Sequence, residues 1–234
     1  MFITSFASGQ WQSNCYLVAG SAAPGTDCVI VDPGWGADEM ARRLVERHRL
    51  RPVAILLTHG HLDHIGAAHG LAAEYEIETW IHPADRRLLR EPGAGLPPDW
   101  APMLRALAGS ETLPEPWLVR ELDDLMELDL GGLGLRIRHA PGHTGGSVLA
   151  LCDYPDDPEV SAVMFSGDVL FAGSIGRTDL PGSDHDAMRR SLEVQILSLP
   201  DDVVALPGHG AQTSIGYERV TNPYLQSDYW RNQS

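Results

Sequence analysis

Three histidines and one aspartate fall within six residues of the segment "THGHLDH", residues 58–64. Imidazole nitrogens and carboxylate oxygens are the ligands by which proteins hold zinc and similar divalent ions. In a turn that leaves a strand, side chains two residues apart can face the same side, so we expect His59 and His61 to share one ion. Asp63 and His64 would face a second point nearby. Alone, the motif is compatible with a structural histidine cluster, a single-metal site or a dinuclear site, and its dense spacing favours metal binding.

Three later loops offer the same kinds of ligand. The segments "APGHTGGS", "FSGDVLF" and "LPGHGAQT" carry His143, Asp168 and His209, each beside glycine and after an apolar run. Glycine lets the backbone turn sharply there and come close to an ion. Together with the first motif, these loops supply nitrogen and oxygen ligands without any cysteine. That set suits zinc, iron or manganese better than copper held by soft ligands.

Strands and helices must bring these loops together. Apolar and alternating runs predict strands at 2–6, 14–20, 27–34, 53–57, 78–82, 117–122, 125–130, 133–143, 147–152, 160–168 and 202–210. Helical periodicity and end signals predict helices at 37–50, 64–75, 83–90 and 184–199, with a short helical tail. Two runs of strands, each supplemented by helices, predict an α/β sandwich with facing sheets and helices outside. We expect one domain over residues 1–234.

Residues 91–116 interrupt this pattern with a proline-rich stretch, "EPGAGLPPDWAPMLRALAGSETLPEP". We predict a long loop with one helical turn around residues 103–108. Loops of this length often cover functional sites, but a surface excursion without a role is an equal alternative.

Charge and composition exclude several classes of function. The net charge of -15 and the sequence pI near 4.9 repel phosphate backbones, which argues against nucleic acid or an anionic membrane as partner. All 17 basic residues are arginine, which excludes Schiff-base lysine chemistry and a lysine-dependent phosphate loop.

Cys15, Cys28 and Cys152 lie far apart in apolar stretches, so we expect buried, reduced thiols. The N-terminus lacks a basic region and no long apolar run is present, which predicts a cytoplasmic protein.

The motifs "THGHLDH", "GHTGGS", "SGDVLF" and "PGHG", in this order and at these separations, resemble the metal-binding motifs of the metallo-β-lactamase-fold hydrolases. The resemblance covers the whole chain and implies an αββα sandwich of two facing mixed sheets flanked by helices. The segments "FAGSIGRTDLPGSD" and "PGHGAQTSIGYERVTNPYL" are similar to the short bacterial glyoxalase II-like group of hydroxyacylglutathione hydrolases. Only 25 residues follow His209, which leaves no room for the helical C-terminal domain of full-length glyoxalase II.

The resemblance implies a role for every candidate ligand. It distributes them over two ions that share one carboxylate: His59, His61 and His143 for the first metal, Asp63, His64 and His209 for the second, and Asp168 as the bridge. The cofactor it implies is a pair of divalent ions, zinc foremost, with iron or manganese as alternatives. Asp168 stands where β-lactamases of the familiar di-zinc type carry cysteine, and this departure argues against antibiotic hydrolysis.

The chemistry that follows is hydrolysis by a metal-bridging hydroxide, because a bound metal lowers the pKa of water from about 15.7 toward 7. A thioester suits such a site, since its leaving thiol, with a pKa of about 8.5, departs without a strong general acid. We therefore predict hydrolysis of hydroxyacyl thioesters of glutathione or of another small thiol. Asp63 would be catalytic as well as a ligand, accepting a hydrogen bond from the hydroxide.

Three alternatives remain open at the level of sequence. The same superfamily contains persulfide dioxygenases, which use one iron held by two histidines and one aspartate, and the ligand types do not exclude that chemistry. A non-enzymatic structural zinc site is a weaker alternative, because such sites are closed and usually rich in cysteine. A phosphodiesterase or nuclease on this fold would need a basic substrate face. The oligomeric state is not determined by the sequence.

Other polar residues near the motifs receive plainer roles. For Arg177 in "GRTD" we favour holding ligand-bearing loops by hydrogen bonds over contacting an anionic substrate. His69 and His82 are expected to pack or to cap helices. His48, His139 and His185 show no metal-type spacing. Three tail residues are expected either to contact substrate or to dock the tail: Tyr217, Asn222 and Tyr224.

Overall fold

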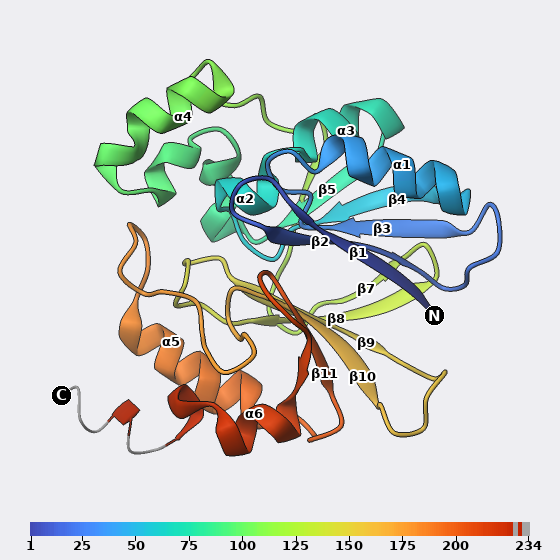
Figure 1. Cartoon of the computed structure of the whole chain (residues 1–234), viewed down its shortest axis with the longest axis vertical. Coiled ribbons are helices and arrows are strands. Elements are labelled where there is room, and N and C mark those ends of the chain that lie inside the picture. The colour runs from blue at the N-terminus through green and yellow to red at the C-terminus, as the bar shows by residue number, and fades with distance from the viewer. Residues whose placement is uncertain (227–228, 231–234) are drawn as a thin grey trace.

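The computed structural model describes residues 1–226 and 229–230 and consists of two sheets packed face to face with helices on both outer sides (Figure 1). Each sheet has six strands, in the orders β1-β2-β3-β4-β5-β6 and β12-β11-β10-β9-β8-β7. Both sheets mix parallel and antiparallel pairs. The predicted αββα sandwich of two mixed sheets is therefore confirmed.

The first sheet is antiparallel at its start and parallel from β3 onward. Its strands are β1 (Phe2–Ser8), β2 (Ser13–Ala19), β3 (Asp27–Val31), β4 (Arg51–Leu56), β5 (Glu78–Ile81) and β6 (Val119–Glu121). β3 and β4 are almost wholly buried and apolar, as expected of parallel strands covered on both faces.

In the second sheet, β10 and β11 form the parallel pair and the other neighbours are antiparallel. Its strands are β7 (Glu127–Leu130), β8 (Leu133–His139), β9 (Val148–Asp153), β10 (Ala162–Gly167), β11 (Val204–Pro207) and β12 (Thr213–Ser214). β7 and β8 alternate between buried and exposed residues. They lie at one edge of the sheet, where one face meets solvent.

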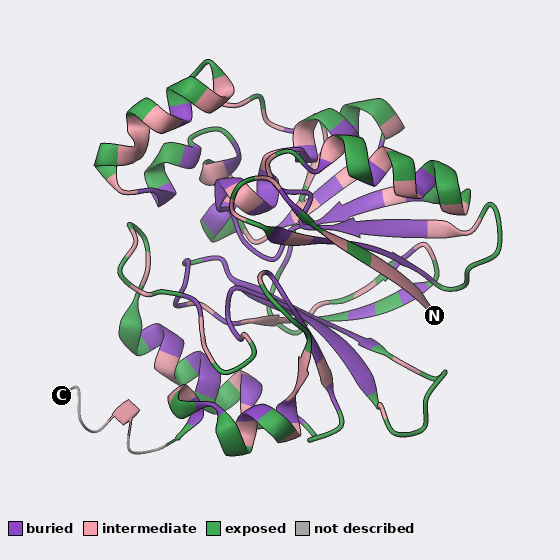
Figure 2. Cartoon of the chain, in the orientation of Figure 1, coloured by how far each residue is buried: buried purple, intermediate pink, exposed green. Residues whose placement is uncertain are grey.

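Helices cover the outer face of each sheet (Figure 1), with buried residues turned toward the sheet and exposed residues toward solvent (Figure 2). The α-helices are α1 (Asp38–His48), α2 (Leu62–Ile65), α3 (Ala68–Tyr75), α4 (Ala101–Ala108), α5 (His185–Ser191) and α6 (Ile215–Thr221). A π-helical turn, Leu192–Ile196, continues α5, and 3₁₀ turns occupy Pro83–Leu89, Pro92–Gly95, Pro98–Trp100 and Pro223–Leu225. Three apolar cores are present: one between the first sheet and helices α1 and α3, one between the two sheets, and one between the second sheet and α5.

The helix predicted over residues 64–75 is divided in the structure. α2 ends at Ile65 and α3 begins at Ala68. The N–H of Ala67 bonds to the carbonyl of Pro33 instead of continuing the helix, and the backbone of Gly66 lies close against Trp35. This tertiary contact bends the chain at Gly66, a residue that itself favours a helix only weakly.

The proline-rich stretch 91–116 is more regular than predicted. Residues 101–108 form two turns of α-helix, and two 3₁₀ turns precede it. Prolines lie at the first or second position of each of these turns, where their missing N–H costs nothing. The prediction of a single helical turn was therefore too short.

The three cysteines are buried and unpaired, as expected. Burial, the larger cause, raises the pKa of the Cys28 thiol to about 12, so this residue behaves as a small apolar side chain. Within the described residues, no helix combines the length and apolar character needed to span a membrane.

Candidate metal centre

The predicted ligands lie where strands of both sheets end. β4 ends at Leu56 and leads into the segment that carries His59 and His61. His143 follows β8, Asp168 directly follows β10, and His209 follows β11. Because β10 and β11 are parallel, their carboxyl ends meet at one edge of the second sheet, facing the loop after β4.

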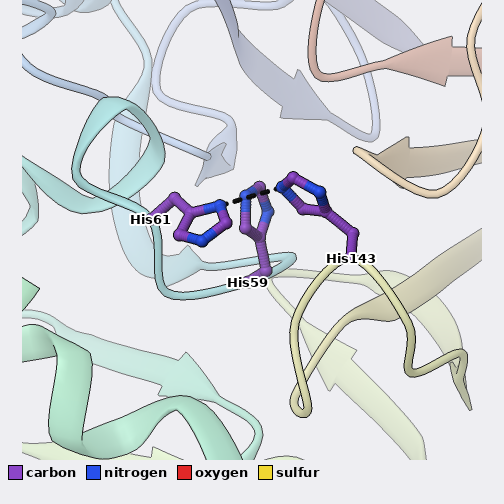
Figure 3. A group of neighbouring side chains, drawn as sticks. All are labelled: His59, His61 and His143. Atoms are coloured by element: carbon purple, nitrogen blue, oxygen red, sulfur yellow. Dashed lines mark hydrogen bonds between the residues drawn. The ribbon is translucent and has the colours of Figure 1, made fainter. Parts of the chain in front are cut away.

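Three histidines form a compact cluster (Figure 3). One ring nitrogen from each of His59, His61 and His143 lies within 4.8 Å of the other two. Nδ1 of His61 is 2.8 Å from Nε2 of His143, the contact drawn as a dashed line. All three side chains are buried. The first sheet contributes two of them and the second sheet one, so the cluster spans the interface between the sheets.

A second cluster lies beside the first and is formed by Asp63, His64 and His209. Nε2 of His209 lies 3.1 Å from Oδ2 of Asp63 and 3.4 Å from Nε2 of His64. His64 is completely buried, whereas the side chains of Asp63 and His209 are 20% and 29% exposed. The second cluster therefore opens toward the surface.

Asp168 lies between the two clusters. Its Oδ2 is 3.5 Å from Nε2 of His143, and its Oδ1 is 3.4 Å from Nε2 of His64. The absence of a side chain at Gly208 makes room for the carboxylate, since a Cβ there would lie 2.1 Å from Oδ1 of Asp168. The structure thus brings all seven predicted side chains close together, in the two groups that the family resemblance implies and with Asp168 between them.

Asp32, which sequence analysis did not single out, supports one histidine in each cluster. It is 2% exposed and directly follows β3. Nδ1 of His64 donates to its Oδ2 at 3.0 Å, and Thr58 donates its hydroxyl and its backbone N–H at 2.6 and 2.7 Å. Because the Thr58 hydroxyl gives its proton to Asp32, it accepts from Nδ1 of His59, 3.1 Å away. Both histidines therefore use Nδ1 for support and turn Nε2 toward the clusters.

Asp85 is a second buried carboxylate that the sequence did not reveal. It accepts hydrogen bonds from the backbone N–H of Gly60 and of Gly146, both at 2.8 Å, and from the Thr144 hydroxyl at 2.6 Å. Gly60 lies in the first ligand loop, and the other two partners lie in the loop of His143. Asp85 thus holds together two loops that come from different sheets.

The two clusters differ in their electrostatics. Burial and, next, the charge of His143 lower the pKa of His61 to about 3. Burial also lowers the pKa of His59 well below its ordinary value, so both imidazoles are neutral at pH 7. Burial acts on His64 in the same direction, but nearby carboxylates, led by Asp168, outweigh it and raise its pKa to about 10. The carboxylates around the second cluster therefore favour a positive charge beside them, which a proton on His64 or a bound cation can supply.

Unpaired polar atoms show that this donor set fits metal ions. Among the described residues, four buried side-chain atoms lack a hydrogen-bond partner, and three belong to the clusters: Nε2 of His59, Nε2 of His61 and Oδ1 of Asp168. An unsatisfied buried polar atom costs about 1–3 kcal/mol. Nitrogen and carboxylate lone pairs that converge without partners are the arrangement a divalent ion satisfies.

Arg177 holds the centre through its backbone. Its carbonyl accepts a hydrogen bond from Nδ1 of His143 at 2.8 Å. Its guanidinium instead makes two hydrogen bonds of 2.7 Å to Asp179. The hydrogen bond to the His143 loop thus involves the carbonyl of Arg177, and its side chain, for which the loop-holding role was predicted, bonds to Asp179.

Three further polar candidates, His82, His69 and Asn222, make structural hydrogen bonds, as expected for the two histidines. His82 caps the 3₁₀ turn Pro83–Leu89 by accepting from the N–H of Ala84, and Nδ1 of His69 donates to the carbonyl of Glu115. Asn222 is fully buried and donates to the carbonyl of Ser174 at 3.1 Å. The tail segment therefore docks on the loop that follows Asp168.

Known sequences resemble the chain over nearly its whole length. The metallo-beta-lactamase superfamily matches residues 8–209, a range that contains all seven candidate ligands. An uncharacterized protein of Mycobacterium tuberculosis is 44% identical over 229 residues, which cover 97% of this chain and 98% of that protein. Hydroxyacylglutathione hydrolase GloC of Haemophilus influenzae is 35% identical over 217 residues, which cover 93% of this chain and 94% of GloC.

Solved structures are also similar to this chain over nearly its whole length. The BLEG-1 B3 metallo-beta-lactamase has a TM-score of 0.79 and 34% identity, and the match covers 97% of this chain and 100% of that one. TTHA1623 in a di-iron-bound form has a TM-score of 0.75 and 36% identity, with 96% and 100% covered. By sequence and by structure, the chain belongs to the metallo-beta-lactamase superfamily.

Proposed function

We propose that this protein is a dinuclear metal-dependent hydrolase that cleaves thioesters of glutathione or of another small thiol. The observation that carries the proposal is the pair of ligand clusters with Asp168 between them, because a single ion would leave one cluster without a cation. The similarity to GloC, a hydroxyacylglutathione hydrolase, supports the thioester as substrate. Buried, unpaired cysteines support a cytoplasmic location.

The first ion would be held by His59, His61 and His143, the second by Asp63, His64 and His209, with Asp168 shared between them. Two divalent ions in these positions would supply Lewis acidity that activates water near neutral pH and polarises the thioester carbonyl. Zinc is our first candidate, and the di-iron form of TTHA1623 keeps iron as an alternative.

The protein's own groups position the reactants. His64 and His209 outweigh the effect of burial on Asp63 and hold the pKa of that carboxyl well below its usual range. Asp63 is therefore ionised at neutral pH and faces the cleft, where it would accept a hydrogen bond from the attacking water. The leaving thiol, with a pKa of about 8.5, needs no strong acid from the protein.

Two other activities can be separated from this one by experiment. β-Lactam hydrolysis is suggested by the 34% identity to the BLEG-1 enzyme. A mononuclear iron persulfide dioxygenase would use only three of the seven ligands, and the second cluster favours two ions over one. Metal stoichiometry and substrate choice distinguish all three.

The test is metal analysis by mass spectrometry combined with an activity screen on the same zinc- or iron-loaded protein. The panel contains S-lactoylglutathione, neutral thioesters, a penicillin, a cephalosporin and glutathione persulfide with an oxygen electrode. We expect two ions per chain and hydrolysis of at least one thioester. Asp168→Ala should lose both metal and activity, whereas Asp186→Ala, at the exposed start of α5, should retain both.

Two results would contradict the proposal. One is inertness toward every thioester with two metals bound. The other is a single iron per chain together with oxygen uptake on the persulfide, which would establish the dioxygenase.

A further inference from the structure

The cleft above the metal centre has a polar floor and apolar walls. It has a volume of about 360 Å³, within the size range of small-molecule sites. Its floor includes Asp63, Asp168 and His209. Leu62 lies next to the floor, and six other large apolar side chains line the walls: Trp11, Leu96, Trp100, Phe171, Ile175 and Leu180.

The apolar walls come from three separate segments of the chain. One is the turn between β1 and β2, the second is the stretch 91–100 ahead of α4, and the third is the loop after β10. Trp11 and Trp100 are half-buried, so part of each indole ring faces the cleft. Nε2 of Gln10, the residue before Trp11, lies 4.0 Å from the sulfur of Met103, so the turn between β1 and β2 contacts α4, the helix that follows the second segment.

The apolar wall reaches the metal centre itself. The ring of Phe171 meets that of His209 edge to face, with centroids 6.0 Å apart. On the other side, Gly95 packs against His61, since a Cβ at this glycine would lie 2.9 Å from Cδ2 of the imidazole. A substrate whose carbonyl lies over the floor therefore has apolar surface directly beside the reacting carbon.

Cationic groups for an anionic substrate are scarce in this cleft. Arg177 is the one basic side chain among the described residues that line it, apart from the histidines of the floor. Its guanidinium is already engaged by both oxygens of Asp179. A glutathione thioester carries two carboxylates, each of which is bound best by a free guanidinium or by several N–H donors. Among the described residues that line the cleft, none offers a free guanidinium.

We infer that the cleft takes an uncharged, predominantly apolar thioester, with an aliphatic or aromatic group against the tryptophan-lined wall, in preference to a glutathione thioester. This inference rests on the proposed thioesterase function, whose substrate it narrows. Burial of the apolar group against Trp11, Leu96 and Trp100 would provide the binding energy, and the metal centre would act only on the carbonyl.

A binding experiment tests the preference without any catalysis. S-hexyl-N-acetylcysteamine and S-hexylglutathione are thioethers that cannot be hydrolysed, and they share the hexyl group but differ in charge. Isothermal titration of the metal-loaded protein should give a Kd at least tenfold lower for the neutral compound. Equal or tighter binding of S-hexylglutathione would overturn the inference.

Two tryptophan variants test whether the apolar wall is responsible for binding of the neutral thioether. Trp100→Ala should raise the Kd of the neutral thioether about tenfold. Trp117→Ala removes a 62% exposed tryptophan that does not line the cleft, and it should change this Kd less than twofold. Equal effects of the two variants would contradict a binding role for the wall.

Activity measurements separate this inference from the proposed function. The kcat/KM for hexanoyl-N-acetylcysteamine should exceed that for S-lactoylglutathione at least tenfold. If S-lactoylglutathione is the better substrate, the inference fails and the thioesterase function stands. If no thioester is cleaved but the neutral thioether still binds more tightly, the proposed function fails and the apolar binding preference stands.

Discussion

Asp32 is linked by hydrogen bonds to two candidate ligands, and we expect it to orient both of them. Its carboxylate accepts from Nδ1 of His64 and from Thr58, which in turn accepts from Nδ1 of His59. In Asp32→Asn one oxygen becomes an NH₂ group, which cannot accept these protons. Loss of a hydrogen bond that orients a metal ligand typically lowers metal affinity about 10- to 100-fold. We expect a loss of this size in a zinc titration with a competing chelator.

Asp27→Asn provides the control for this prediction. Asp27 begins the same strand, β3, and its side chain pairs with Arg51 at the surface. Its replacement should leave zinc affinity unchanged within twofold. If Asp32→Asn also retains full affinity while circular dichroism shows a native fold, then Asp32 does not orient the ligands.

Single residues differ in how far the sequence reveals them. The seven candidate ligands were recognisable because histidines crowd into residues 59–64 and the others follow apolar strands beside glycine. Asp32 occupies the same strand-end position as Asp168, so a signal existed and was missed. Asp85 gives no such signal. Its role depends on Thr144 and Gly146, 59 and 61 residues away along the chain, and only the folded structure brings them to it.

At the level of elements, Asp85 is the link between the loop after β4 and the loop after β8. Asp85→Asn keeps the shape of the side chain but places an NH₂ group against N–H and O–H donors. Because a buried donor left unsatisfied costs about 1–3 kcal/mol, we expect the free energy of unfolding to fall by about 3 kcal/mol. Urea denaturation followed by circular dichroism measures this change.

The control for the loop link is Asp186→Asn in the first turn of α5, where the side chain is exposed. It makes the same chemical change but removes only a helix-dipole interaction, worth about 0.3–1 kcal/mol. If both variants lower stability by the same small amount, Asp85 does not hold the two loops together.

Elements with strong apolar patterns were predicted well, and those shaped by contacts between distant segments were not. The buried strands β3 and β10 lie within their predicted ranges, and β4 overlaps most of its predicted range. The predicted helix over 64–75 is broken at Gly66 by the backbone of Trp35, a contact between separate parts of the chain. Gly66 weakens the helix locally, but the neighbouring sequence does not identify Trp35 as the residue it contacts.

At the level of the whole molecule, the candidate metal centre lies at the interface between the two sheets. Hydrogen bonds outside the centre also connect the sheets there. Asn14 of β2 donates to the carbonyls of Pro207 and Gly210, both at 2.9 Å, on either side of His209. The overall αββα layering could be predicted from the order of strands and helices. The meeting of four loops at one edge could be expected only through the family resemblance, and a single domain over residues 1–234 stays a prediction.

Because ligands from both sheets would hold the ions, metal binding should stabilise the entire fold. Binding to the native state alone adds about 4.1 kcal/mol at a metal concentration of 1,000 times Kd. For a chain of 234 residues, each kcal/mol raises Tm by about 2–4 °C, so zinc should raise the Tm of chelator-treated protein by roughly 8–16 °C. Differential scanning calorimetry measures the shift, and Asp168→Ala should lose most of it. Magnesium, which prefers oxygen ligands, is the control and should shift Tm far less. An unchanged Tm with zinc bound would contradict the prediction, because it would show that zinc binds the unfolded chain as tightly as the folded one.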